Sequence, residues 1–131
     1  KPVPVEITYG LERLCMFVQG KNNVFDLDWN NEGVKYKEVF FQAEKEFSAY
    51  NFEFANTDTL LKNFENTENE CKSLLQKNLS LPAYDQCLKA SHIFNLLDAR
   101  GVIGVAERTG YITRIRELAK GCGALWLSSQ S

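Results

Sequence analysis

Ile112-Thr-Arg-Ile-Arg-Glu-Leu-Ala-Lys-Gly-Cys-Gly-Ala-Leu-Trp126 is the stretch that most clearly sets the fold class. Its apolar side chains recur at Ile112, Ile115, Ala119, Cys122 and Trp126, which is the spacing of one face of an α-helix. Charged residues fill positions between them, so we expect one face to be buried and the other solvated. The pattern predicts a helix that packs against other helices.

A helix near 36–54 is predicted upstream, and its apolar face is mostly aromatic. The residues expected to form its core-facing stripe are Val39, Phe40, Ala43, Phe47, Tyr50 and Phe54. They recur at helical rather than sheet spacing, which favours a packed core over a platform for stacking nucleic-acid bases.

Two more helices are predicted between these. One lies near 58–77, with Asn56 or Thr57 as its cap and a stripe of Leu61, Phe64, Cys71 and Leu75. The other opens at Ser80-Leu81-Pro82 and runs toward Arg100, with Tyr84, Leu88 and Ser91 recurring behind the proline. Gly101 and Gly104 then interrupt the chain. Residues 36–131 are therefore predicted to be mainly α, a helical bundle of about four helices.

The first 35 residues follow a different pattern. Val5, Ile7 and Tyr9 alternate with Glu6 and Thr8, which predicts a half-buried strand. Helical spacing begins after Gly10 and stops at Gly20, and an Asn- and Gly-rich connector follows over 21–35. Because a lone strand needs partners, and the chain does not begin with methionine, we expect a fragment whose missing N-terminal part holds the rest of a sheet.

Composition excludes several classes of protein. The 131 residues carry 15 basic and 17 acidic groups, and this near balance disfavours a stand-alone nucleic-acid binder. Four widely spaced cysteines and one histidine make a zinc site unexpected, and the cysteines are predicted to be free, mostly buried thiols. No apolar run is long enough to span a membrane and the N-terminus has no hydrophobic signal core, so a cytoplasmic protein is predicted.

The candidate site lies in Val5-Glu-Ile-Thr-Tyr-Gly-Leu-Glu-Arg-Leu14. Glu6 and Thr8 share one strand face, Gly10 admits close approach, and Arg13 stands in the first turn of a helix, where N–H groups favour an anion such as phosphate. The alternative is that Arg13 forms a surface ion pair with Glu12 or a neighbour, and that Glu6 is solvated. Spacing alone leaves both open.

This segment resembles the third signature motif of class II aminoacyl-tRNA synthetases, in the wording of the alpha subunit of bacterial two-subunit, glycine-specific enzymes. Further strings resemble the C-terminal half of that subunit, in the same order along essentially the whole chain. They are residues 24–29, 50–55, 81–84, 91–101 and 105–108. The resemblance implies that residues 1–35 are the end of an antiparallel α+β catalytic domain and that 36–131 are a C-terminal helical domain.

The resemblance also implies roles for individual residues. Arg13 would be the catalytic, ATP-binding arginine that contacts the terminal phosphate, and Gly10 would let the adenine lie against the strand. Glu6 and Thr8 would line the glycine pocket, with Glu6 receiving the ammonium group. Mg²⁺ would bridge the phosphates of ATP, and no protein-bound metal is implied. The reaction joins glycine to ATP as glycyl-adenylate and then passes the glycyl group to tRNA(Gly).

The family's first two motifs have no counterpart in this sequence, so the chain by itself is expected to be inactive. The implied partners are a second alpha subunit and the beta subunits of an α2β2 tetramer, the beta subunit being the main tRNA binder. The alternative is a non-catalytic helical module that docks a partner subunit.

Polar residues outside the motif are interpreted structurally. His92 has no paired nucleophile and is expected to be hydrogen-bonded or half-exposed on its helix. Arg114, Arg116 and Lys120 are interpreted as a solvated face, with tRNA contact as the alternative. Ion pairs that fix the angle between two helices are expected around the Gly101 and Gly104 break, from Asp98, Arg100, Glu107 and Arg108, with contact to the beta subunit or to the tRNA acceptor end as the alternative.

Overall fold

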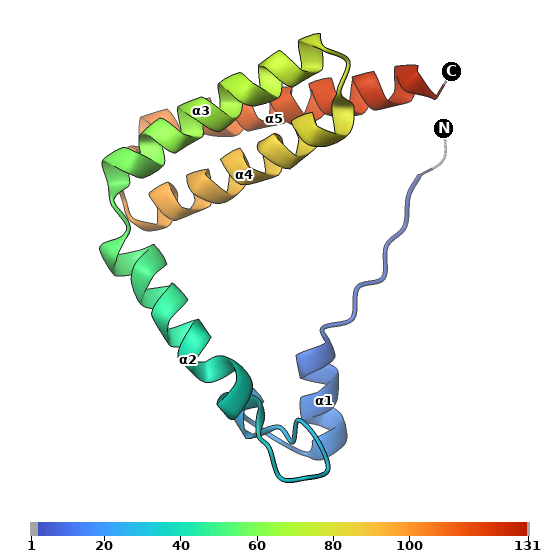
Figure 1. The fold of residues 1–131 in the computed structure, drawn as a ribbon, viewed down its shortest axis with the longest axis vertical. Coiled ribbons are helices and arrows are strands. Elements are labelled where there is room, and N and C mark those ends of the chain that lie inside the picture. The colour runs from blue at the N-terminus through green and yellow to red at the C-terminus, as the bar shows by residue number, and fades with distance from the viewer. Residues whose placement is uncertain (1–2, 131) are drawn as a thin grey trace. The chain divides into compact units, whose positions relative to one another are not determined.

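A computed structural model describes residues 3–130 of the chain, which are mainly helical, as predicted (Figure 1). In order, the elements are α1 (Leu11–Gln19), the 3-10 turn η1 (Val24–Asp26), α2 (Tyr36–Ala49), the π-helical turn η2 (Tyr50–Phe54), α3 (Thr57–Gln76), α4 (Ser80–Ala99) and α5 (Val105–Ser129). The chain divides into two compact units between Ala49 and Tyr50. No helix in the described range combines the length and apolar character needed to cross a bilayer.

The predicted strand over Val5–Tyr9 is not formed. Residues 3–10 have no regular secondary structure, and the side chains of Val5, Ile7 and Tyr9 are 74–87% exposed. A strand exists through hydrogen bonds to a neighbouring strand, and residues 3–130 supply none, apart from one isolated bridge between Asp28 and Lys35. The alternating pattern is therefore present without the pairing that would make it a strand.

The predicted helix after Gly10 is confirmed as α1. Gly20 ends it in the left-handed conformation, with φ at 62°, and its N–H donates to the carbonyl groups of Met16 and Phe17. A glycine adopts this conformation without the steric cost of a Cβ atom, which explains why the helix stops there. None of the nine residues of α1 is buried.

The second unit has its core between α3, α4 and α5, which lie side by side (Figure 1). Asn56 caps α3 by accepting from the N–H of Thr59 at 2.8 Å, as one of the two predicted caps. Helices α3 and α5 approach closely: a Cβ atom on Gly121 would lie 3.0 Å from Cδ1 of Leu75. The buried cluster comprises Ala55, Leu60, Phe64, Cys71, Ala83, Cys87, Ala90, Phe94, Leu96, Leu97, Ile103, Leu118 and Cys122.

The buried face of α4 differs from the predicted one. Tyr84 and Leu88 are exposed, and the core is instead reached by a stripe of smaller residues before Phe94 and Leu97. That stripe is Ala83, Cys87 and Ala90. Small side chains let α3 approach closely, so close packing rather than side-chain size decides which face of α4 is buried.

The aromatic stripe of α2, predicted to be core, is also largely exposed in this structure. Phe47 is 67% exposed, and Val39 and Phe40 remain at 43% and 38%. Helix α2 is grouped with the first unit, where Phe41 packs edge-on against Phe25 of η1 at 5.0 Å between ring centroids. The three helices α3–α5 therefore form the bundle of the second unit, while the division at residues 35 and 36 into catalytic and helical domains stays a prediction.

One of the ion pairs expected at the α4–α5 turn is confirmed, that between Asp98 and Arg108. Nε of Arg108 donates to both carboxylate oxygens of Asp98, at 3.2 and 3.0 Å. The Glu107 side chain accepts from the Gly104 N–H at 3.1 Å and so caps α5. Arg100 donates to the Ala55 carbonyl at 2.9 Å, which ties the end of α4 to the residue after η2. These contacts hold the α4–α5 turn and attach the end of α4 to the segment before α3.

The prediction that Arg114 belongs to a solvated face is wrong. Its Nη2 and Nε donate to the two carboxylate oxygens of Glu68 on α3, at 2.5 and 3.1 Å. The guanidinium also lies 4.7 Å from the ring centroid of Phe64 and 5.0 Å from that of Tyr111. Glu68 is buried and also pairs with Lys72 at 3.0 Å. A charged network therefore joins α3 to α5.

This network predicts how stability depends on pH. The hydrogen bond from Arg114 lowers the pKa of Glu68, burial raises it, and the hydrogen bond from Lys72 lowers it further. The net result is a pKa below the ordinary 4.5. The ionised form is favoured in the folded state, so its stabilisation is complete above about pH 4.5 and is lost as the pH falls through the lowered pKa. Urea unfolding between pH 7 and pH 3 should show this loss.

The matched variant is Glu68→Gln, which should flatten that pH dependence, with Glu70→Gln as the control because Glu70 is exposed on the same helix. A wild-type curve that Glu68→Gln leaves unchanged would show that Glu68 does not supply the linkage.

Candidate functional site

Glu6 and Thr8 lie on the irregular segment before α1, and their side chains point toward one another. The Thr8 hydroxyl donates to Oε1 of Glu6 at 2.5 Å, and both residues are exposed. Glu6 and Thr8 were predicted to share one face of a strand. The strand is not formed, but the two side chains are in contact. A carboxylate and a hydroxyl at this distance could together receive an ammonium group.

Arg13 stands in the first turn of α1, three residues after Gly10. Gly10 is the N-cap, and it caps the helix with no side-chain hydrogen bond. A Cβ atom on Gly10 would lie 3.8 Å from Cγ and Cδ of Arg13, so the arginine side chain lies back over the glycine. The guanidinium is exposed, and within residues 3–130 it makes no ion pair or hydrogen bond.

The proposed alternative, a surface ion pair between Arg13 and Glu12, is therefore not formed. Glu12 instead interacts with Tyr36 at the start of α2, where burial and then this carboxylate raise the pKa of Tyr36 above its ordinary value. An arginine without a partner, beside helix N–H groups that also lack side-chain partners, is suited to binding an anion. The structure thus keeps Gly10 and Arg13 together and leaves both accessible.

The other face of α1 rests on the connector. A cleft separates Leu11, Glu12 and Cys15 of α1 from an opposing wall. That wall consists of Leu27, Asp28, Trp29, Tyr36 and Phe40. Leu27 is a buried residue of this wall, with 3% of its surface exposed. Glu12 and Cys15 therefore face the connector while Arg13, next to Glu12, points elsewhere.

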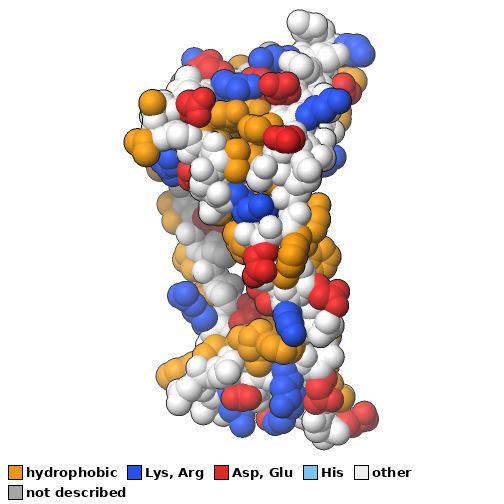
Figure 2. All heavy atoms as spheres, turned by 90° about the vertical axis from the view of Figure 1, so that its left-hand side faces the viewer, with side chains coloured by type: hydrophobic (Ala, Val, Ile, Leu, Met, Phe, Trp, Pro, Cys, Tyr) orange, Lys and Arg blue, Asp and Glu red, His pale blue; other side chains and the backbone are white. Residues whose placement is uncertain are grey.

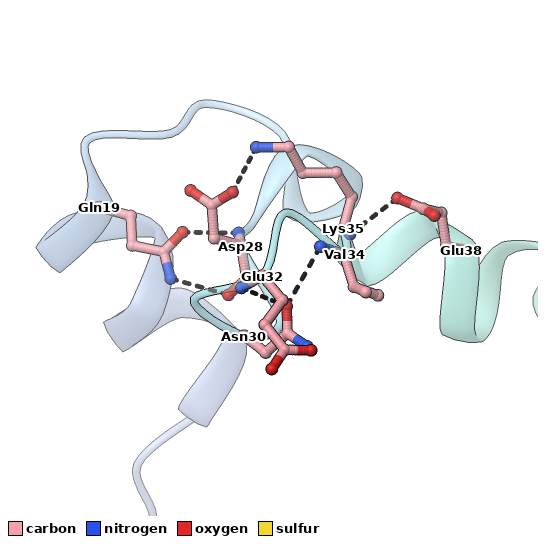
Figure 3. A network of polar contacts seen from close by, with 7 residues as sticks. All are labelled: Gln19, Asp28, Asn30, Glu32, Val34, Lys35 and Glu38. Atoms are coloured by element: carbon pink, nitrogen blue, oxygen red, sulfur yellow. Dashed lines mark hydrogen bonds and ion pairs between the residues drawn. The ribbon is translucent and has the colours of Figure 1, made fainter.

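Gln19 attaches α1 to the connector (Figure 3). Its side-chain amide accepts from the Asp28 N–H at 2.8 Å and donates to the Asp28 carbonyl at 3.1 Å. Sequence analysis missed this contact because a single glutamine on a short helix has no distinctive spacing. The one available signal was that Gln19 lies seven residues after Glu12, on the same side of a helix.

The connector is itself ordered by a network of polar contacts (Figure 3). The Asn30 side chain accepts from the N–H groups of Glu32 and Val34, at 3.0 and 3.1 Å. The Lys35 side chain pairs with the Asp28 carboxylate, which lowers the pKa of Asp28. The backbone N–H of Lys35 donates to the Glu38 side chain at 2.9 Å. The loop is thereby fixed to the first turn of α2.

Among residues 3–130, His92 and the cysteines belong to no group that could hold a metal ion. His92 is exposed and lines a shallow groove of α3 and α4 beside Asn63 and Lys89. Cys71, Cys87 and Cys122 are buried free thiols, as predicted, whereas Cys15 is exposed. Burial, and then neighbouring Cys122, raise the pKa of Cys71 to about 12, which leaves it an unreactive thiol at neutral pH.

The surface carries no extended basic face in the view of Figure 2, where acidic and basic side chains are interspersed with apolar ones. Arg116 is exposed, and Lys120 lies 3.9 Å from Glu117 on the same helix. Arg114 pairs with Glu68, so Arg116 and Lys120 are the exposed residues that remain of the three basic residues considered as a tRNA contact.

A family model described as "Glycyl-tRNA synthetase alpha subunit" matches residues 1–131, which is the whole chain. The match includes the segment with Glu6, Thr8, Gly10 and Arg13 as well as the three-helix bundle.

Proposed function

Because the chain belongs to the glycyl-tRNA synthetase alpha subunit family, whose members are glycine–tRNA ligases, we propose that residues 5–14 form one wall of the site that activates glycine with ATP. The observation that carries the proposal is the unpaired guanidinium of Arg13 at the N-terminus of α1, beside Gly10. Both features suit an incoming phosphate and have no other partner in the described chain.

The proposed reaction has two steps. The carboxylate of glycine attacks the α-phosphorus of ATP, which forms glycyl-adenylate and releases pyrophosphate. The terminal ribose hydroxyl of tRNA(Gly) then attacks the carbonyl carbon and releases AMP. Arg13 would hold the terminal phosphate and balance its charge, and this positioning requires no protein nucleophile.

Glu6 and Thr8 are proposed to contact glycine. The Glu6 carboxylate would accept hydrogen bonds from the substrate ammonium, and the Thr8 hydroxyl, now bonded to Glu6, would hold that carboxylate in place. Mg²⁺ is proposed to arrive with ATP, bridging its phosphates.

The proposed partners are tRNA(Gly), a second alpha subunit and beta subunits, in an α2β2 assembly in the cytoplasm. The near-neutral charge of the chain supports leaving most tRNA contact to the beta subunit. A second candidate is a helical module that docks a partner subunit without catalysis. The exposed Trp126 and Tyr84, which flank a shallow groove of α4 and α5, favour it, because such residues are enriched at interfaces.

Calorimetric titration of Mg–ATP into the chain separates these candidates. We expect binding, and Arg13→Ala should weaken it at least tenfold, which is about 1.4 kcal/mol. Arg116→Ala is the control, because that arginine is exposed on α5 and should leave the affinity unchanged. Absence of ATP binding by the wild-type chain would contradict the ATP-site proposal for these 131 residues and favour the docking module.

A further inference from the structure

We propose that Gln19 is a positioning residue for Arg13, acting through its two hydrogen bonds to the backbone of Asp28. The inference rests on the proposed function in one respect, namely that Arg13 binds a phosphate of ATP. It concerns how α1, the helix that carries Arg13, is held.

Helix α1 needs an external anchor. It has nine residues and none of them is buried, and isolated helices shorter than about 12–15 residues are marginal in water. Among the described elements its backbone packs against η1, a single 3-10 turn, and Glu12 also interacts with Tyr36 at the start of α2. The orientation of α1 therefore depends on a small number of contacts with the connector and the start of α2.

The Gln19 amide is the most directional of these contacts. One oxygen and one nitrogen of a planar group bond the N–H and the carbonyl of the same residue, at 2.8 and 3.1 Å. Such paired bonds resist rotation of the helix about its axis, because turning α1 would break both bonds. A contact through apolar side chains is less directional.

The residue that receives these bonds is itself held firmly. Trp29 N–H donates to the Val34 carbonyl at 2.8 Å, and Tyr36 N–H donates to the Leu27 carbonyl at 2.9 Å. Together with the Asp28–Lys35 ion pair, these bonds close the loop onto α2. Gln19 thus connects α1 to a braced loop (Figure 3).

Helical geometry explains why this anchor leaves Arg13 free. At about 100° per residue, Gln19 lies within about 20° of Glu12 around the axis and about 120° from Arg13. Glu12 faces the cleft, which agrees with this assignment. The anchor therefore lies on one stripe of α1, and Arg13 projects from another, toward solvent.

The test compares Gln19→Met, which is close in size but makes neither bond, with Gln42→Met as a matched control. Gln42 is exposed on α2 and donates to Glu46 of the same helix at 2.5 Å. Amide hydrogen exchange of the 131-residue chain should accelerate about tenfold over α1 in Gln19→Met, while α3–α5 keep the wild-type rates. Unchanged exchange over α1 would overturn the inference.

A double-mutant cycle distinguishes positioning from general destabilisation. Gln19→Met should weaken Mg–ATP binding about fivefold in the wild-type background and much less in the Arg13→Lys background, because its effect passes through Arg13. Equal effects in both backgrounds would mean that Gln19 is structural and would overturn the positioning role. Absence of ATP binding by wild type contradicts the proposed function, and hydrogen exchange then decides whether Gln19 anchors α1.

Discussion

Replacing Phe64 with alanine is expected to lower the free energy of unfolding of the second unit by about 3–5 kcal/mol. Phe64 is 1% exposed, and its ring contacts Tyr111 edge-on at 4.9 Å between centroids. The substitution would leave a cavity between α3 and α5 and would remove the ring over which the Arg114 guanidinium lies. Urea unfolding followed by circular dichroism at 222 nm, a standard helix signal, measures the change.

Phe54→Ala is the matched control for this prediction. Phe54 belongs to the same unit but is 75% exposed, so its truncation should cost no more than about 0.5 kcal/mol. Phe64→Leu should fall between the two, because leucine fills part of the space. Similar losses for Phe54→Ala and Phe64→Ala would contradict the assignment of the core to α3–α5.

Replacing Arg114 with alanine is expected to cost about 2–4 kcal/mol, the second largest effect. The Glu68 carboxylate, with a side chain 8% exposed, would lose both bonds from the guanidinium and keep Lys72 as its cation. The cost comes from leaving a buried charge incompletely paired, and the lost contacts with Phe64 and Tyr111 add to it. Equilibrium unfolding at pH 7 provides the measurement.

Two variants test whether the pairing itself is responsible. Arg116→Ala, which changes an exposed arginine two residues further along α5, should alter stability by no more than about 0.5 kcal/mol. Adding Glu68→Gln to Arg114→Ala should recover part of the loss, since the uncompensated charge is removed as well. If the double variant is as unstable as the sum of the single variants, the two side chains do not act as a pair.

The helices of this protein follow from local patterns. The Asn56 cap, the Ser80-Leu81-Pro82 start and the Gly20 stop each depend on nearby backbone geometry, and each element they predict is present. The ion pair at the α4–α5 turn was predictable for the same reason, because Asp98 and Arg108 flank one short connection. The resemblance of residues 5–14 to a synthetase motif likewise led to the family that the whole chain matches.

Contacts between distant segments were predicted less well. The pairing of Glu68 with Arg114 joins residues on α3 and α5, and charge spacing along α5 by itself had suggested a solvated face. The anchor made by Gln19 similarly depends on where the connector folds back. For the candidate site, the sequence pointed to Arg13 and Gly10. The hydrogen bonds of Gln19, which we propose to orient Arg13, became visible only in the three-dimensional structure.

Periodicity, capping residues and glycine stops were sufficient to determine that this chain is helical and where α1 and α3–α5 lie, because these signals act within a few turns. Tertiary structure alone decided which helix faces are buried. Ala83, Cys87 and Ala90 of α4 face the core because close packing rewards complementary shape, while the larger Tyr84 and Leu88 remain exposed. It also decided that Val5–Tyr9 is no strand, since strand formation requires hydrogen bonds to a neighbouring segment that residues 3–130 do not supply.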